Sequence, residues 1–189
     1  MCSKGVNNLS AALAADVDKA FPALVKATQD RLYSLALSFA RKAADADDVT
    51  QDAYVRAYRA LRTYPPARIR VLHVRPWLAK IALNVWRNRV RSHARDPAPL
   101  LEEPAGDETD APAARFERSE SVAQLRALVA KLPERYRVAV QLRHVYDLPY
   151  AEAARVLGIP VGTLKANVHR GTRMLRDAFE RRAKVNGND

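Results

Sequence analysis

The stretch LPYAEAARVLGIPVGTLKANVHRGTRML, residues 148–175, decides the fold of the second half of this chain. It predicts a short helix that ends at Gly158, because glycine readily adopts the left-handed conformation that turns a chain sharply after a helix. Pro160 then opens a second helix. Ala151 and Ala154 are small, as the close crossing of two helices requires. This spacing is typical of a helix-turn-helix, whose second helix enters the major groove of DNA.

The second helix of this motif is expected to present a polar, basic face. Its outward residues are predicted to be Thr163, Lys165, Ala166, Asn167, His169, Arg170 and Arg173. Its packed face is predicted to consist of Val161, Leu164, Val168, Met174 and Leu175. Lys and Arg side chains can bind phosphate or guanine, and Asn can pair with adenine through two hydrogen bonds. The alternative is an ordinary helical hairpin with a solvated basic face.

The composition indicates a folded protein with a polyanionic partner. Hydrophobic residues make up 48% of the 189 residues, which is enough for a packed core. The formal net charge is +11, which favours nucleic acid or an anionic membrane surface as a partner. No apolar run approaches the roughly 18 residues of a membrane span, and the N-terminus lacks an apolar signal-peptide core. We therefore expect a cytoplasmic protein without membrane insertion.

The charges divide the chain into two halves. Residues 53–95 contain eleven Arg and Lys residues and no Asp or Glu. Residues 96–114 contain six acidic residues, four prolines and no Lys or Arg, and they show no helical or strand period. We predict an all-α fold of two small helical domains, at 9–95 and 119–183, joined by an acidic flexible linker at 96–118.

The apolar periodicity is helical on both sides of this linker. In the first half, three stripes at three- and four-residue steps fall within 21–39, 49–61 and 78–90, and predict three or four helices. In the second half, helices are predicted at about 120–131, after Pro133, at 149–157 and at 160–182. Tyr136, Val140 and Leu142 are expected to point inward.

Three stretches of the sequence are similar to a known family. LPERYRVAVQLRHVYDLPYAEAARVLGIPVGTLKANVHRGTRMLRDAF (132–179) resembles region 4 of the extracytoplasmic-function group of sigma-70-family factors. DADDVTQDAYVRAYRAL (45–61) resembles region 2.2, and RPWLAKIALNVWRNRVRSHAR (75–95) resembles regions 2.3 and 2.4. The resemblance implies an alternative sigma factor that binds core RNA polymerase, recognises the minus-thirty-five and minus-ten promoter elements and promotes DNA melting. It implies no enzymatic activity and no cofactor.

An acidic group precedes the basic block and predicts a protein-docking face. Asp45, Asp48 and Asp52 share one side of the predicted helix, because they are spaced by three and four residues. Acids on a very basic protein suggest a basic protein partner, since DNA would repel them. The resemblance implies that this face binds core RNA polymerase. The residues that the family motif assigns to this role are Asp45, Asp48, Gln51, Asp52 and Arg56. Alternatively, the acids only favour a helix N-terminus.

The basic stretch 75–95 is expected to hold the melted minus-ten element. A single strand is bound by a basic groove together with stacking or with pockets for flipped bases. The family captures a flipped base with a loop, which here would centre on Asn84, Val85 and Trp86. The predicted minus-ten residues are Lys80, Asn84, Trp86, Arg87 and Arg91, with Arg89 as a further phosphate contact and His93 near the same side. The alternative is a core role for Trp86 and a solvated surface for the arginines.

Two departures from the family pattern affect the C-terminal motif. Ala166 and Asn167 stand where Ser and Arg are common, so the minus-thirty-five preference is expected to differ. Pro149 replaces a common Ser, so the first helix of the motif is expected to lack its side-chain cap.

Other functions are less compatible with the sequence. No Gly-rich phosphate loop, no H-E-x-x-H motif and no clustered Cys and His ligands are present, which argues against an enzyme or a metal site. A stand-alone helix-turn-helix transcriptional regulator is the main alternative, and a basic amphipathic membrane-surface protein is a weaker one. Partners are expected to be core RNA polymerase, promoter DNA as duplex and as melted non-template strand, and an anti-sigma factor.

Overall fold

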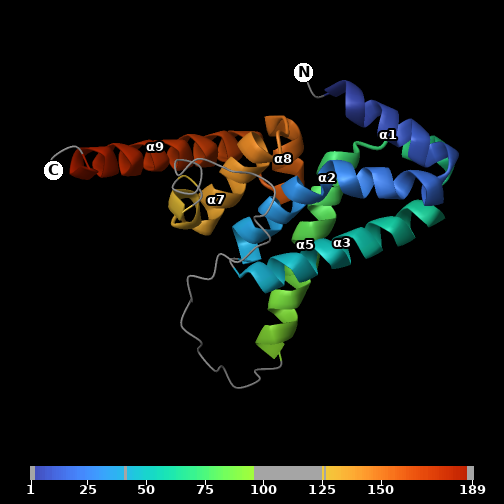
Figure 1. Cartoon of the computed structure of the whole chain (residues 1–189), viewed down its shortest axis with the longest axis horizontal. Coiled ribbons are helices and arrows are strands. Elements are labelled where there is room, and N and C mark those ends of the chain that lie inside the picture. The colour runs from blue at the N-terminus through green and yellow to red at the C-terminus, as the bar shows by residue number, and fades with distance from the viewer. Residues whose placement is uncertain (1–2, 41, 96–124, 126, 187–189) are drawn as a thin grey trace.

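The computed structural model describes residues 3–40, 42–95, 125 and 127–186, with the backbone alone at 3–8, 93–95 and 182–186. Every regular element within these ranges is a helix (Figure 1). The predicted all-α fold with two helical domains is therefore confirmed. The expected linker at 96–118 lies outside the described residues, and the expected helix at 120–131 is described only in part.

Within the described residues, the N-terminal domain has five helices, one more than the three or four predicted. They are α1 (Ser3–Ala15), α2 (Val17–Ala40), α3 (Ala43–Thr63), α4 (Pro66–Arg70) and α5 (Val74–Arg95). The C-terminal domain has α7 (Glu134–Val140), the π-helical turn η1 (Gln141–Val145), α8 (Tyr150–Leu157) and α9 (Val161–Asn186). Figure 1 shows α2, α3 and α5 lying across one another, with α9 extending away from them.

Small side chains allow the helices of the N-terminal domain to pack closely. Ala53 and Ala57 of α3 are fully buried, as are Ala79 and Ala82 of α5. The predicted stripes of α2 and α3 face this core, but Val90 of α5 was expected to pack and is 47% exposed. Val90 instead lines the groove between α5 and the C-terminal domain, together with Trp86 and Arg91.

One buried polar pair links α2 to α3. The hydroxyl of Thr28 lies 2.8 Å from the carbonyl oxygen of Leu24 and 2.8 Å from the hydroxyl of Tyr54. Burial raises the pKa of Tyr54 to about 12, although the hydrogen bond to Thr28 opposes that rise. Each hydroxyl is satisfied within the core, which is why the helices tolerate polar atoms there.

The C-terminal domain is organised around the buried face of α7. Tyr136, Val140 and Leu142 are buried, as predicted. The amide of Tyr146 donates to the carbonyl of Gln141 at 2.8 Å, a five-residue step that defines the π-helical turn. Leu164 and Val168 of α9 are buried, whereas Val161 and Met174 were expected to pack and are 40% and 38% exposed.

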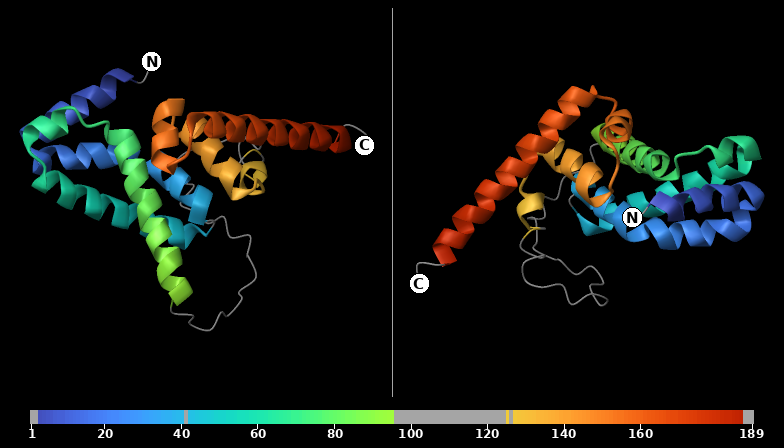
Figure 2. Two further views of the ribbon diagram at one scale, coloured as in Figure 1. Left: turned by 180° about the vertical axis from the view of Figure 1, so that it is seen from behind. Right: turned by 90° about the horizontal axis from the view of Figure 1, so that it is seen from above.

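The two domains share one continuous apolar core. The same cluster contains Leu32 of α2, Leu78 of α5, Leu142 of η1, Val156 of α8 and Leu164 of α9. α8 lies beside α5, and α7 and η1 lie against α2, as the two further views of Figure 2 allow the reader to follow. Folding therefore places the helix-turn-helix against the N-terminal domain.

Gly171 is predicted to be required for the packing of α9 on α7. A β-carbon added there would lie 2.7 Å from Cγ2 of Val140 and 3.3 Å from Cβ of Tyr136, whereas one added at Gly162 meets nothing within 4 Å. Gly171→Ala should lower the free energy of unfolding by about 1–3 kcal/mol through overpacking. Gly162→Ala should leave it unchanged or raise it by up to about 1 kcal/mol through helix propensity. Urea denaturation of both variants measures the difference, and equal stability would contradict the packing.

Candidate nucleic-acid interface and docking face

The acidic face of α3 is exposed on the side opposite its buried stripe. Asp48 and Gln51 are exposed and Asp52 is half-exposed, while Val49 and Ala53 are fully buried. Asp45 is half-exposed and Arg56 is exposed further along the helix. The structure thus brings these side chains to one accessible surface, as the helical spacing predicted.

Arg89 joins this acidic face to α5. Its guanidinium donates to Oδ2 of Asp48 at 2.9 Å and to Oδ2 of Asp52 at 3.1 Å. The hydrogen bond to Asp48 is the main reason that the pKa of Arg89 is raised. Two carboxylates therefore hold the Arg89 guanidinium in this structure, and its predicted phosphate contact stays a prediction. Sequence reasoning missed this pair because 37 residues separate Arg89 from Asp52.

The residues predicted to bind the minus-ten element lie within the continuous helix α5. The expected loop at Asn84, Val85 and Trp86 is not present, because no Gly or Pro interrupts the helix there. Val85 is 1% exposed and belongs to the core, whereas Asn84 is exposed. The side chain of Trp86 is half-buried, with its ring centroid 6.1 Å from that of Phe39.

Two cationic side chains of α5 contact α8. Nζ of Lys80 donates to the carbonyl of Val156 at 2.8 Å, and Nη2 of Arg87 donates to the carbonyl of Leu157 at 3.4 Å. Partial burial lowers the pKa of Lys80, with a smaller contribution from the charge of Arg87. Arg91 is exposed, and the side chain of His93 lies outside the described residues. The structure therefore brings Lys80 and Arg87 together, as expected, but both side chains contact main-chain carbonyls of α8.

The helix-turn-helix has the predicted local geometry. α8 ends at Gly158, which has φ of 71° and donates its amide to the carbonyl of Ala154 at 2.8 Å. This left-handed residue turns the chain into α9. Pro149 precedes α8 and makes no side-chain capping bond, as predicted.

The predicted reading face of α9 is accessible over most of its length. Six of its seven residues are exposed, namely Thr163, Lys165, Ala166, His169, Arg170 and Arg173. Asn167 is half-buried and lines a groove that also contains Trp86 and Arg91. The Lys165 ammonium lies 5.8 Å from the centre of the Tyr150 ring, which positions it beside the first helix of the motif.

No metal site accompanies these surfaces in the part of the chain that the structure describes: no three His, Cys, Asp or Glu side chains there converge to hold an ion. Among the described helices, none is long and apolar enough to cross a membrane. A basic helix presented by a helix-turn-helix, together with a second basic helix, defines a nucleic-acid-binding protein with two helical domains.

Comparison with known families identifies its class. Residues 24–96 match the family model for Sigma-70 region 2, and residues 123–175 match that for Sigma-70, region 4. The ECF RNA polymerase sigma factor SigE of Mycolicibacterium smegmatis is 33% identical over 159 residues, which are 82% of this chain and 59% of that relative. The RNA polymerase sigma-H factor of Pseudomonas aeruginosa is 30% identical over 172 residues, which are 86% of this chain and 87% of that relative.

Solved structures show the same architecture. The structure of CnrH in complex with the cytosolic domain of CnrY aligns with a TM-score of 0.62 at 27% identity, over 92% of this chain and 96% of that one. The sigma factor RpoE in complex with the anti-sigma factor NepR from Bartonella quintana aligns with a TM-score of 0.67 at 21% identity, over 86% of this chain and 98% of that one. This second match is a likeness of fold alone. The chain belongs to the extracytoplasmic-function (ECF) RNA polymerase sigma factors of the sigma-70 family.

The ion pairs of Arg89 are predicted to contribute little to stability. Its side chain is 28% exposed and those of Asp48 and Asp52 are 59% and 48% exposed, so water and salt screen both pairs. Arg89→Ala should lower the free energy of unfolding by less than about 1 kcal/mol, and by less still at high salt. Arg91→Ala, at an exposed site on the same helix, is the control. A loss several times larger than this, unchanged by salt, would contradict the screened geometry.

Proposed function

We propose that this alternative sigma factor binds core RNA polymerase through α3, reads the minus-ten element with α5 and reads the minus-thirty-five element with α9. Region 2 functions are assigned to residues 9–95, region 4 functions to 119–183, and 96–118 to the linker between them. The observation that carries the proposal is the presentation of an exposed basic helix by the Gly158 turn, on a chain that also carries a separate acidic face.

The docking assignment rests on charge and exposure. Asp48, Gln51 and Asp52 offer an acidic surface on a protein of net charge +11. Such a surface repels DNA and attracts a basic protein surface. Arg89 keeps the two carboxylates close together, so a partner would meet them as one patch. Arg56 and Asp45 extend the proposed surface along α3.

The DNA assignments follow from side-chain chemistry. In α9, Lys165, Arg170 and Arg173 can contact phosphates or guanine, and Asn167 can read an adenine. In α5, Lys80, Arg87 and Arg91 would hold the melted non-template strand, Asn84 would read a base edge, and Trp86 would stack on a base. The polymerase would supply the catalysis, so no enzymatic role or cofactor is assigned to this chain.

The remaining partners and the location follow from the same role. Because core polymerase is cytoplasmic, we place the sigma factor in the cytoplasm. An anti-sigma protein is included among its partners, because the similar CnrH was solved in complex with a protein, the cytosolic domain of CnrY. The two matched family models describe sigma factor regions, so neither supports a stand-alone regulator.

Reversal of charge on α3 is predicted to abolish binding to core polymerase. The double variant Asp48→Arg with Gln51→Ala should bind at least about 100-fold more weakly, because it places a cation where a basic partner docks. The matched control, Asp30→Arg with Gln29→Ala, makes the same chemical changes at exposed sites on α2. Fluorescence titration of labelled sigma factor with core enzyme measures both affinities. Equal weakening by the two variants would contradict the assignment to α3.

Substitutions in α9 are predicted to separate base reading from phosphate binding. Once run-off transcription across genomic DNA has defined the promoter, Asn167→Ala should relax the preference at one base pair by about 1–3 kcal/mol. Arg173→Ala removes a proposed phosphate contact, so it should weaken binding to all sequences equally. It should also reduce by about one the slope of the logarithm of the affinity against the logarithm of the salt concentration. Competition of promoter variants for the holoenzyme measures both. A uniform loss with Asn167→Ala would contradict its role as a base reader.

A further inference from the structure

The exposed side of α3 extends beyond the residues assigned to polymerase docking. Val55 follows Asp48 by seven residues and Gln51 by four. It precedes Arg59 by four residues and Arg62 by seven. Such steps place side chains on one side of a helix, and all five of these residues are exposed, opposite the buried stripe of α3. This surface is the α3 strip, which comprises Asp48, Gln51, Asp52, Val55, Arg59 and Arg62.

The α3 strip changes sign along the helix. Its first half carries the carboxylates of Asp48 and Asp52. Its second half carries the guanidinium groups of Arg59 and Arg62, and Val55 lies between the two halves. Acids at the start of a helix and cations at its end favour the helix dipole, but this effect is confined to the first and last turns. α3 is 21 residues long, so Asp48, Asp52 and Arg59 lie outside those turns. The order of charges therefore has a cause outside the helix itself.

The middle of the α3 strip is apolar and partly held in place. Val55 is 47% exposed, and Tyr58, three residues further on, is half-buried. The ring of Tyr58 packs edge-on against Phe21, with centroids 5.1 Å apart, and its hydroxyl donates to Asp18 at 2.7 Å. The guanidinium carbon of Arg62 lies 5.8 Å from the centre of the same ring. Tyr and Arg side chains that are ordered before binding lose little conformational entropy, and both residue types are frequent at the energetic centres of protein interfaces.

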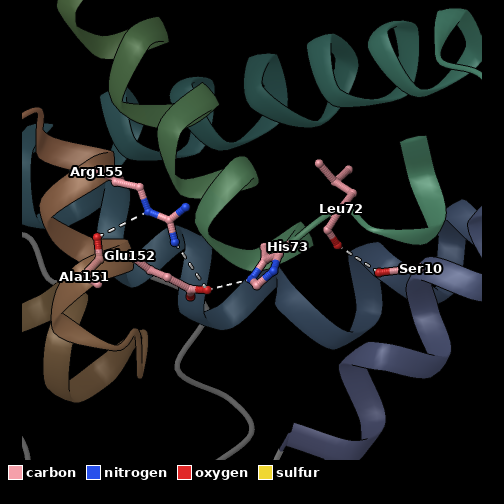
Figure 3. Close-up of polar contacts among 6 residues, drawn as sticks. All are labelled: Ser10, Leu72, His73, Ala151, Glu152 and Arg155. Atoms are coloured by element: carbon pink, nitrogen blue, oxygen red, sulfur yellow. Dashed lines mark hydrogen bonds and ion pairs between the residues drawn. The ribbon is translucent and has the colours of Figure 1, made fainter. Parts of the chain in front are cut away.

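The arginines of the α3 strip keep their charge free for a partner. Arg155 of α8 shows the opposite case, because it donates to the carbonyl of Ala151 at 3.4 Å and lies 4.0 Å from Glu152 (Figure 3). Arg59 and Arg62, by contrast, form no ion pair with any residue that the structure describes. Their N–H groups can therefore donate to carboxylates or phosphates of another molecule.

The surroundings favour a protein over DNA as the partner of these arginines. Asp52 and Arg59 are seven residues apart, which is about 10 Å along a helix axis. The hydrogen bond from Tyr58 also brings Asp18 to the same end of α3. A nucleic acid strand at Arg59 would thus meet carboxylates within about one Debye length, roughly 8–10 Å at cellular ionic strength. A protein can place charges of the opposite sign against each half, and an apolar side chain against Val55.

We propose that core polymerase contacts the whole α3 strip, with cations against its acidic half, an apolar side chain against Val55 and carboxylates against Arg59 and Arg62. This assignment rests on the proposed docking of polymerase on α3 and extends it to three further residues. Docking in the reverse direction would bring like charges together at both ends, so the strip admits one orientation. Because α5 packs on α3, that orientation also positions the minus-ten helix on the polymerase.

Truncation of the apolar centre is the first arm of the test. Val55→Ala should weaken binding of core enzyme about fivefold, because about half of the valine side chain would otherwise become buried. The control, Val90→Ala, removes the same atoms from a residue of α5 that is also 47% exposed, and it should leave the affinity unchanged. Val55→Ala should melt no lower than wild type, since alanine favours a helix more than valine does. Equal affinities of the two variants would overturn the proposal.

Reversal of charge in the basic half is the second arm. Arg59→Glu with Arg62→Glu should weaken binding of core enzyme at least about tenfold, because carboxylates would then face carboxylates. The control, Arg68→Glu with Arg70→Glu, makes the same change in charge at exposed sites of α4. Equal weakening by both variants would overturn the proposal. Unchanged core affinity with lost promoter binding would also overturn it, because these arginines would then contact DNA.

A third titration separates this proposal from the proposed function. Asp48→Arg with Gln51→Ala is measured alongside, with full-length labelled sigma factor and core enzyme throughout. If only this variant weakens binding, docking on the acidic residues stands and the extended α3 strip is refuted. If this variant binds core enzyme as tightly as wild type, the proposed docking on α3 is itself refuted.

Discussion

Ala153 and Ala154 of α8 are almost without exposed surface, and they share one apolar core with Ala79 and Ala82 of α5. Side chains of this size permit two helices to approach closely, and burial of the surrounding aliphatic residues drives that approach. The polar contacts between the domains depend on it. Lys80 and Arg87 meet the carbonyl end of α8 because this shared core brings α5 and α8 into contact.

The same packing gives the molecule two kinds of surface. The acidic face of α3 and the basic face of α9 are exposed, while Lys80 and Arg87 of α5 donate hydrogen bonds to α8. Under the proposed function each surface suits a different partner: a basic protein for α3, duplex DNA for α9 and a melted single strand for α5.

Arg137 strengthens the junction from the opposite side of the core. It is 3% exposed, and its guanidinium donates to the carbonyls of Leu132 within its own domain and of Ser38 at the end of α2. A buried cation is tolerated only when it is hydrogen-bonded, so these carbonyls offset the cost of burying the Arg137 guanidinium. The junction is therefore polar as well as apolar, unlike the core of a typical permanent interface.

The sequence by itself determined the features that depend on neighbouring residues. The helical periods, the left-handed turn at Gly158, the missing cap at Pro149 and the shared face of Asp48 and Asp52 all follow from spacing within a few residues, where backbone geometry leaves few choices. Only the tertiary structure decided that Arg89 holds those two aspartates, and that Lys80 and Arg87 lie against α8, 76 and 70 residues away. Such pairs leave no local periodicity to detect. They are set by how two apolar faces meet, and only the folded chain brings these faces together.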